Sequence, residues 1–424
     1  MTVAALELND LSLLIQAEDG ASHAEPGFAR LTSDGIVTGE EARAVAWREP
    51  QHVYNQYWRQ LNQTPLPGRH RFARHHADIA FAQLRNLWQT TGSPEDLIVL
   101  APGNFARAQL SLLLGMIEAL PSRASAVIDS ALAACADVEG DTLYVDLQMH
   151  ESVLTVCRPC ESSIRIEDQK IFPGLGMGQI QNSLARHISD LLIEDYRFDP
   201  LHSSETEQAI YNQIPHWLIR LRRERDVSIK LASHDGERPC ILNRDAIKAI
   251  IGDRFAGVRS FLEKWQGCSL LLSHASGLLT GLVDEFSGAE IFGQTAGAER
   301  CLLQHAEILD QVDELCRVRA LNRPGFDAAA APAAGVNGER LATHLLYGDR
   351  ALPLSEPVSI RIEENGPRIS SETDHGAALT VVMRNRSLET LNLAADVSLP
   401  LTCRPGESIR IGGHELKLIR VGSD

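Results

Sequence analysis

The sequence has no uninterrupted apolar run of about 18 residues, so it predicts no membrane-spanning helix. The first residues, MTVAALELNDLSLL, lack a basic region followed by a long apolar core, and we expect no secretory signal. Cysteine is sparse, with eight residues scattered through 424. So few cysteines do not form a disulfide framework in a chain of this length, which favours the reducing cytoplasm.

Positively charged residues are outnumbered by negatively charged ones. Lys and Arg number 40 against 56 Asp and Glu, and the formal net charge is −16. General binders of nucleic acid or of anionic membranes need cationic surface, so the balance argues against both classes of partner. Charge does not constrain the fold.

The length predicts at least two domains, because single cores stop growing near about 250–300 residues. Residues 1–320 alternate strand-like and helical patterns, as an α/β domain does; among them are a strand running into a helix at 124–136, an amphipathic helix at 247–265 and a helix at 278–288. Residues 321–340 are rich in Ala, Pro and Gly and predict a linker. Residues 341–424 show short alternating runs that predict a small all-β sandwich, and no tandem repeat is visible anywhere.

One segment combines a strand, an acidic residue and a second strand. Residues 143–156 read LYVDLQMHESVLTV, with Asp146 just before the turn and Gln148, Met149 and His150 within it. Side chains in such a turn hinder close approach of the backbone to a ligand, and β-carbons disfavour positive φ. The segment therefore predicts a hairpin whose turn is poorly suited to cradle phosphate.

Several pieces occur in an order that resembles the nucleotide-binding domain of DnaK-type, seventy-kilodalton heat-shock chaperones, within the actin-like ATPase superfamily. The pieces lie at 35–61, 101–120, 126–136, 143–156, 270–286 and 296–309. The resemblance implies a two-lobed fold, each lobe a ribonuclease-H-like sheet flanked by helices, with a nucleotide cleft between the lobes. It also implies ATP or ADP with Mg²⁺ as the candidate cofactor.

The resemblance carries roles onto individual residues. Asp146 corresponds to the aspartate of the family's phosphate hairpin and either holds Mg²⁺ through water or caps the hairpin turn as a strand-end residue. Asp129 corresponds to the catalytic glutamate of the family. The adenosine turn corresponds to His274, Ala275 and Ser276. A glycine-spaced segment before a helix corresponds to amides that touch the nucleotide, or else to a tight turn, and comprises Gly174, Gly176 and Gly178.

The departures from the family decide the predicted function. The first phosphate loop is replaced near LLIQAEDGAS, with Gln16 close to the expected aspartate, and the glycines after Asp146 are gone. Phosphoryl transfer needs Mg²⁺, a water and phosphate donors positioned together. We therefore predict an assembly or protein-interaction component, partnered by another protein, with weak or no ATP hydrolysis. The alternative is an active ATPase with a rearranged site.

The β-rich end faintly resembles a forkhead-associated β-sandwich, which implies a phosphopeptide-binding adaptor as a further alternative. Arg361 and Ser371 are the nearest candidates for phosphate contacts, and His375 follows in the same stretch. The glycine that precedes the family's arginine is missing.

A pair of cysteines has two competing interpretations. Cys157 and Cys160 form a Cys-Arg-Pro-Cys run that fits a redox site or half of a zinc site. Its place at a hairpin end and the absence of a second cysteine pair favour a structural role.

A basic stretch, GRHRFARHHAD at 68–78, also has two interpretations. It fits either a site for an anion or a metal, or a solvated basic patch. Its basic residues are Arg69, His70, Arg71, Arg74, His75 and His76.

Overall fold

The computed structural model describes residues 2–68, 70–160, 163–279, 282, 288–310, 317–318, 320–322, 342–347, 350–363, 366–371, 377–384, 387–393, 397–398, 408–411 and 414–419. The chain divides into two compact units, Met1–Phe326 and Asp327–Asp424. The first unit is mixed α/β and the second is built from strands in its described residues, which confirms the predicted coarse class.

The first six-stranded sheet has the order β16-β8-β7-β1-β2-β3. Strands β1 to β3 form an antiparallel meander, and β7 and β8 continue the sheet parallel to β1. Its strands are β1 (Val3–Glu7), β2 (Leu13–Ala17), β3 (Ser22–Glu25), β7 (Asp96–Ala101), β8 (Arg123–Asp129) and β16 (Arg317–Val318).

The second six-stranded sheet repeats five strands of this plan, and its sixth strand, β17, lies beside the meander rather than beside the parallel strands. Its order is β15-β14-β9-β10-β11-β17, in which β9 to β11 form an antiparallel meander and β14 and β15 follow in parallel. Its strands are β9 (Thr142–Leu147), β10 (Glu151–Cys160), β11 (Ser163–Pro173), β14 (Ser269–Leu272), β15 (Glu290–Ile291) and β17 (Ala320–Asn322). The chain thus contains a repeat of strand order that its residues do not reveal.

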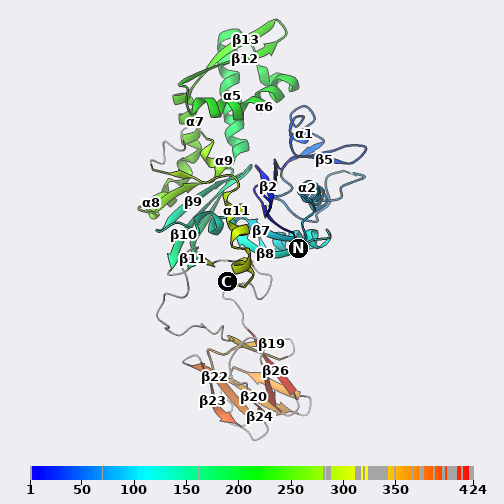
Figure 1. Ribbon diagram of the computed structural model, residues 1–424, viewed down its shortest axis with the longest axis vertical. Helices are drawn as coiled ribbons and strands as arrows, with labels where there is room; N and C mark the ends of the chain where they lie inside the picture. The colour runs from blue at the N-terminus through cyan, green and yellow to red at the C-terminus, as the bar shows by residue number, and fades with distance from the viewer. Residues whose placement is uncertain are drawn as a thin grey trace. The chain divides into compact units, whose positions relative to one another are not determined.

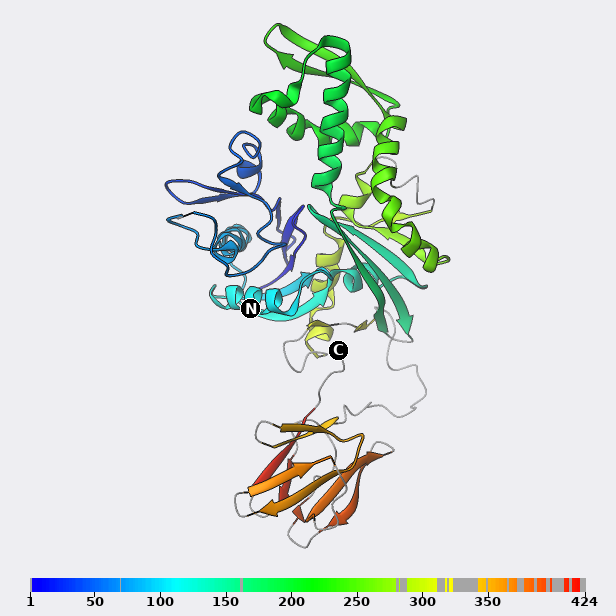
Figure 2. The same cartoon turned by 180° about the vertical axis from the view of Figure 1, so that it is seen from behind.

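Two short helices lie beside the junction of the sheets: the first contacts strands of both sheets, and the second, labelled α11 in Figure 1 and seen from behind in Figure 2, contacts the first helix and the first sheet. They are α4 (Ser130–Cys135) and α11 (Ala296–Leu303), and their buried Ala and Cys side chains join Ile98, Tyr144 and Leu271 in one core. Small side chains allow a helix to approach a sheet closely. This shared core holds the two sheets in one unit.

Other helices cover the outer faces. The first sheet packs on α2 (His76–Thr90) and α3 (Arg107–Glu118), and the second packs on the start of α5 (Met177–Tyr196) and on α8 (Arg259–Lys264). The rest of α5 forms a separate group beyond one end of the second sheet (Figure 1), together with α6 (Ser204–Leu221), α7 (Arg244–Phe255) and the hairpin β12 (Asp226–Ser233) and β13 (Gly236–Asn243). Strand β7 is buried at every position because both faces are covered, whereas β12 alternates buried and exposed residues.

Smaller elements complete the first unit. A three-stranded sheet of order β5-β4-β6 lies beside the short α1. These elements and the remaining short ones are β4 (Ala29–Leu31), β5 (Ile36–Thr38), β6 (Val53–Tyr54), α1 (Glu40–Arg43), η1 (Pro200–His202), η2 (Ala256–Val258), α8 (Arg259–Lys264), α9 (His274–Gly277) and α12 (His305–Asp310).

The structure corrects two predicted elements. The periodic segment 247–265 predicts one helix, but α7 ends at Phe255 and the 3₁₀ turn η2, which contains Gly257, separates it from α8. The predicted linker 321–340 begins too early, because β17 extends to Asn322; the rest of that stretch lies outside the described residues. Most of the helix predicted over 278–288 also lies outside them.

The second unit consists of two sheets, of order β19-β18-β26-β25-β24 and β21-β20-β22-β23. Buried side chains of both sheets, among them Leu345, Ile360, Val381 and Leu418, form one core. Its strands are β18 (His344–Tyr347), β19 (Arg350–Pro353), β20 (Val358–Glu363), β21 (Gly366–Ser370), β22 (Leu379–Arg384), β23 (Ser387–Leu393), β24 (Val397–Ser398), β25 (Ser408–Ile411) and β26 (His414–Ile419).

Across the part of the chain that the structure describes, no helix is long and apolar enough to cross a membrane.

Candidate functional site

The first hairpin turns of the two sheets are hydrogen-bonded directly to each other. The Asn9 side chain, between β1 and β2, donates from Nδ2 to Asp146 Oδ1 over 2.9 Å and to the Leu147 carbonyl over 3.0 Å. In return, the Met149 amide donates to Asp10 Oδ1 over 2.7 Å. We call Glu7, Asn9, Asp10, Asp146 and Gln148 the central site.

The turn after Asp146 does not need glycine for its own conformation. It is closed by a 3.0 Å bond from the Gln148 amide to the Glu151 carbonyl, and neither Met149 nor His150 has a positive φ. The Met149 side chain packs on Phe28 and Ala42. His150 uses Nε2 to bond the Asn55 carbonyl over 2.8 Å.

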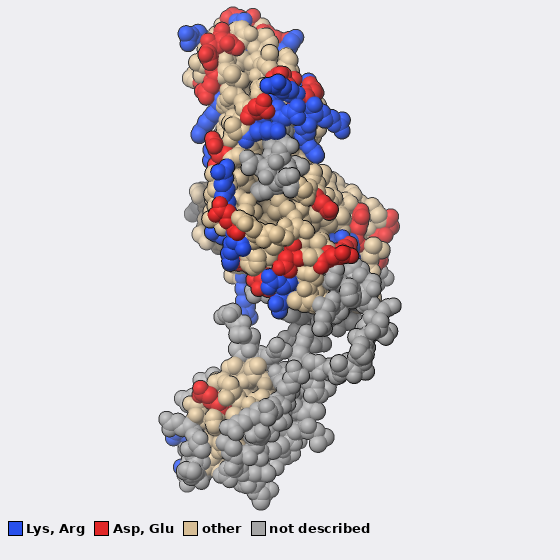
Figure 3. All heavy atoms as spheres, turned by 90° about the vertical axis from the view of Figure 1, so that its left-hand side faces the viewer, with Lys and Arg blue, Asp and Glu red and all other residues tan. Residues whose placement is uncertain are grey.

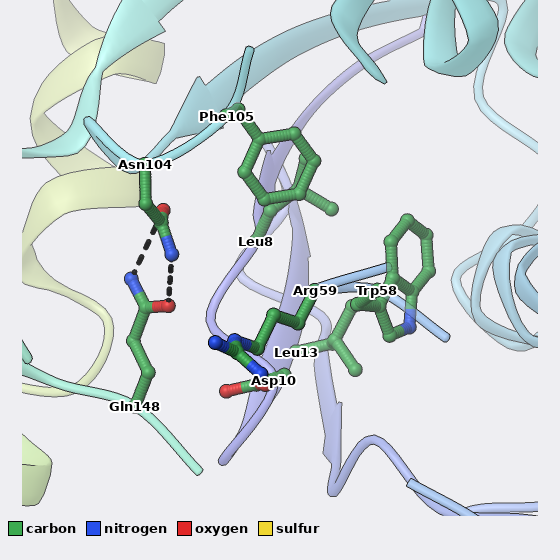
Figure 4. Close-up of a pocket in the computed structure, with 8 residues that line it drawn as sticks. All are labelled: Leu8, Asp10, Leu13, Trp58, Arg59, Asn104, Phe105 and Gln148. Carbon is green, nitrogen blue, oxygen red and sulfur yellow. Dashed lines mark hydrogen bonds between the residues drawn. The ribbon is translucent and has the colours of Figure 1, made fainter. Parts of the chain in front are cut away.

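These contacts correct the expected steric role of Met149 and His150, whose side chains are engaged elsewhere. Gln148 is the turn residue that reaches Asp146, with 3.1 Å between Nε2 and Oδ2. It also forms a reciprocal amide pair with Asn104, drawn in Figure 4, in which Asn104 Nδ2 donates over 2.6 Å.

A charged pair adjoins this amide pair. Asn104 Nδ2 also donates to Glu151 Oε1 over 2.7 Å, and Arg59 Nε donates to Glu151 Oε2 over 2.9 Å. The hollow enclosed by Asp10, Arg59, Asn104 and Gln148 measures about 10 Å³ (Figure 4). That volume is about the size needed for one water molecule.

Burial changes the acidity of three carboxyl groups. It raises the pKa of Glu7 to about 8, with a further contribution from Asp146, and raises the pKa of Asp10 and of Asp146 to about 7. These groups therefore hold protons near neutral pH, where ordinary carboxylates are ionised. Clustered groups with such perturbed pKa values often mark functional sites.

A second hollow, of about 50 Å³, lies between the two sheets. Its wall includes Glu7, Asn9, Tyr144, Asp146, His274 and Phe292. Pockets for small molecules and cofactors usually measure about 300–1,000 Å³, so this hollow accommodates a few waters rather than a nucleotide.

The predicted adenosine turn is divided between this hollow and the core. His274 and Ala275 line the hollow, and burial together with the charge of Arg222 lowers the pKa of His274. Ser276 is fully buried and bonds the end of β9: its Oγ donates to the Val145 carbonyl over 2.9 Å and accepts from the Leu147 amide over 3.1 Å. The Ser276 hydroxyl therefore makes its hydrogen bonds to the backbone at the end of β9.

The predicted phosphate amides at the start of α5 donate within the protein. The Gly174 amide bonds the His150 carbonyl, the Met177 amide bonds the Gln148 carbonyl, and the Gly178 amide bonds the Met149 carbonyl. The Gly176 amide bonds Gln179 Oε1. A β-carbon at Gly176 would lie 2.5 Å from His150 C and Met149 O, so the glycine permits close packing of helix on turn. Of the two sequence interpretations, this geometry favours the tight turn.

Asp129 acts as a helix cap. It is 2% exposed, and its Oδ1 accepts from the Ala131 amide over 3.0 Å at the start of α4. Gln169 Nε2 lies 3.4 Å from its Oδ2. Asp129 and Asp146 are close enough to influence each other's charge, but Asp129 lines neither hollow described above.

The sequence prediction missed Glu7, Asn9 and Asp10. It placed the first loop near Gln16, which the structure shows on β2, paired with Ala5 and buried. The signal was present: VAALELND ends an apolar strand with acidic and amide residues, as LYVDLQ does at Asp146. Comparing the two strand ends would have located the turn.

Cys157 and Cys160 do not share a site. Both lie on β10, three residues apart, so they face opposite sides of the sheet. Cys157 is fully buried and Cys160 is half-buried. This arrangement supports the structural interpretation of the Cys-Arg-Pro-Cys run.

The other clusters are only partly described. Arg69 and His375 lie outside the described residues. Arg74 is paired with Asp78, at 3.2 Å from Nε to Oδ2, and His75 Nδ1 lies 3.5 Å from the same oxygen. His76 Nδ1 lies 3.2 Å from the Gln60 carbonyl, and the His76 ring centroid lies 6.4 Å from that of Tyr54.

Comparison with known proteins does not name a family. No protein-family model matches this sequence, and no curated protein matches it significantly.

Proposed function

We propose that the first unit is a divergent relative of the DnaK-type nucleotide-binding domain, with one lobe built on each six-stranded sheet. The shared strand order supports this: β3-β2-β1-β7-β8 and β11-β10-β9-β14-β15 each place an antiparallel meander beside two parallel strands. The resemblance implies such a duplicated, ribonuclease-H-like plan. Fold does not fix function, so the activity is argued from the site.

In this proposal the protein is an assembly or interaction component that binds another protein and hydrolyses ATP weakly or not at all. The observation that carries it is the direct bonding between the two hairpin turns, from Asn9 to Asp146 and from Met149 to Asp10. In the superfamily the nucleotide phosphates enter between the corresponding turns. Here protein groups already bond across that space.

The chemistry agrees with this assignment. The Met149 and Gly178 amides are bonded to protein oxygens, so binding phosphate there requires breaking internal hydrogen bonds. Asp10 and Asp146, with pKa values raised to about 7, are partly protonated near neutral pH and are weak ligands for Mg²⁺ in that state. ATP or ADP with Mg²⁺ would enter only after the turns separate.

The alternative, an active ATPase with a rearranged site, depends on Asp146. Calorimetric titration of the full chain with ATP and Mg²⁺, combined with phosphate release, tests both possibilities. We expect no binding heat and the same background release from wild type and from Asp146→Ala. Saturable binding with turnover that Asp146→Ala abolishes, but the exposed-site control Asp235→Ala retains, would establish the ATPase instead.

A second candidate function belongs to the second unit. Arg361 on β20 lies directly opposite Arg368 on β21, both exposed, and Ser371 follows the end of β21. Neighbouring guanidinium groups are suited to phosphate, which supports the phosphopeptide-adaptor alternative. Arrays of phosphothreonine peptides probed with the full chain test it. Binding that survives both Arg361→Ala and Arg368→Ala would remove this candidate.

A further inference from the structure

A third hollow, larger than the two at the central site, lies away from that site. It measures about 650 Å³ and is formed by β4 with the turn after it, the turn before β6, and the loop before α2. We call it the peripheral groove; Arg30, Glu49, His52, His70, Arg71 and Phe72 line it. It lies in the region labelled β5 and α2 in Figure 1. Its volume falls within the range of functional pockets.

The peripheral groove holds one arginine without an acidic partner in the described part of the chain. Its one acidic side chain, Glu49, is paired with Arg30, whose Nη2 lies 2.6 Å from Oε2. Arg71 has no acidic partner among the described residues. In a chain of net charge −16, this unpaired guanidinium beside a large hollow favours an anionic ligand.

Several other basic side chains of the first unit lie in ion pairs. The face drawn in Figure 3 also carries a dense group of Lys and Arg, but Asp and Glu side chains are interspersed with it. Ion pairs on the second-sheet side of the unit include Arg220–Glu224, Arg225–Asp245 and Lys264–Asp168. The peripheral groove differs from them in combining unbalanced charge with a large hollow.

The peripheral groove also exposes an aromatic ring. Phe72 is 39% exposed, and the Arg71 guanidinium lies 5.0 Å from its ring centroid. A cation over an aromatic face makes a platform for both an apolar side chain and a carboxylate. Leu31 is an apolar residue of the groove wall and is itself largely buried.

We infer that the peripheral groove binds a short acidic peptide segment of a partner protein, with a carboxylate at Arg71 and an apolar side chain on Phe72. Nucleic acid is disfavoured because a long polyanion would also meet the surrounding negative field. A peptide presents its charge over a few residues, which the dimensions of the groove match. This inference goes beyond the proposed function, because it does not depend on whether the central site admits nucleotide.

The test is fluorescence anisotropy with the full chain and a labelled synthetic peptide of Asp and Glu residues around one Phe. We expect saturable binding that weakens with added salt and is lost for the matched Asn/Gln peptide. Arg71→Glu should weaken binding about tenfold or more, since it replaces an attraction with a repulsion. Phe72→Ala should weaken it about fivefold.

Arg85→Glu is the matched control, because it makes the same change in net charge at an exposed position on α2 outside the groove. It should weaken binding less than about twofold. Equal effects of Arg71→Glu and Arg85→Glu, equal binding of the Asn/Gln peptide, or no saturable binding would overturn the inference. Tighter binding of a single-stranded RNA of equal charge would also overturn it, in favour of a nucleic-acid ligand.

Discussion

The central site and the peripheral groove use charged and polar groups in opposite ways. In the central site, Asn9, Asp10 and Asp146 are hydrogen-bonded to other parts of the chain, and the adjoining hollows measure about 10 and 50 Å³. In the peripheral groove, Arg71 has no acidic partner among the described residues, and the hollow measures about 650 Å³. Groups bonded internally stabilise a structure, whereas unbalanced groups around an open hollow are available to a partner.

The raised pKa values of Asp10 and Asp146 in the central site have two possible explanations. Raised pKa values often mark catalytic groups, but they also arise wherever carboxyl groups are buried in a packed interior. At Asp10 and Asp146 the hydrogen bonds run between the turns of the two sheets, so burial follows from turn-to-turn contact. The raised pKa values of Asp10 and Asp146 therefore follow from burial and do not show that a ligand can reach these two groups.

The largest effect is expected at Gly176. Gly176→Ala places a β-carbon 2.5 Å from backbone atoms of His150 and Met149, so the helix must move away from the turn. We expect a loss of about 3 kcal/mol in unfolding free energy, measured by urea denaturation.

Gly115→Ala is the control for that substitution. Gly115 lies in α3 with open space around it, so the change should stabilise the helix by about 0.5–1 kcal/mol. A Gly176→Ala protein as stable as wild type would mean that the turn is not packed against α5.

The next largest effect is expected at Asn9. Asn9→Ala removes the two bonds from Nδ2 to Asp146 and to Leu147 and leaves Asp146 with fewer donors. The expected loss is about 2 kcal/mol, because buried acceptors without partners cost more than exposed ones. Gln60→Ala, which removes an exposed bond to Gln56, should cost less than about 0.5 kcal/mol. Equal costs would contradict the proposed link between the turns.

A smaller, pH-dependent effect is expected at Glu7. Burial raises its pKa from 4.5 to about 8, so between these values the folded state keeps a proton that the unfolded state loses. Its contribution therefore lowers the unfolding free energy as pH rises from 4.5 to 8. Below that range both states are protonated and the difference vanishes.

Glu7→Gln removes this dependence. Because Glu7 is half-buried at the edge of a hollow, we expect a modest gain of about 1 kcal/mol over wild type at pH 8 and none at pH 4. Urea denaturation at several pH values measures it, with the exposed Glu118→Gln as control. A variant whose stability falls as steeply as wild type between pH 5 and 8 would refute the assignment.

The sequence predicted the elements whose signals are local. The run at 124–136 predicted a strand entering a helix, and β8 leads into α4 there. The hairpin around Asp146 is also confirmed as β9 and β10. In contrast, the bond between Asn9 and Asp146 joins residues 137 positions apart, and periodicity carries no information about such a pairing. The spacing of glycines singles out Gly176 in the sequence, but only the structure shows the backbone that packs against it.

Amide hydrogen exchange of the full chain, followed with and without saturating ATP and Mg²⁺, tests the central claim most directly. If the turns are bonded to each other, the Met149, Met177 and Gly178 amides exchange slowly without nucleotide, and nucleotide leaves their rates unchanged. Fast exchange at these amides without nucleotide, and strong protection with it, would show that phosphate occupies the space between the turns.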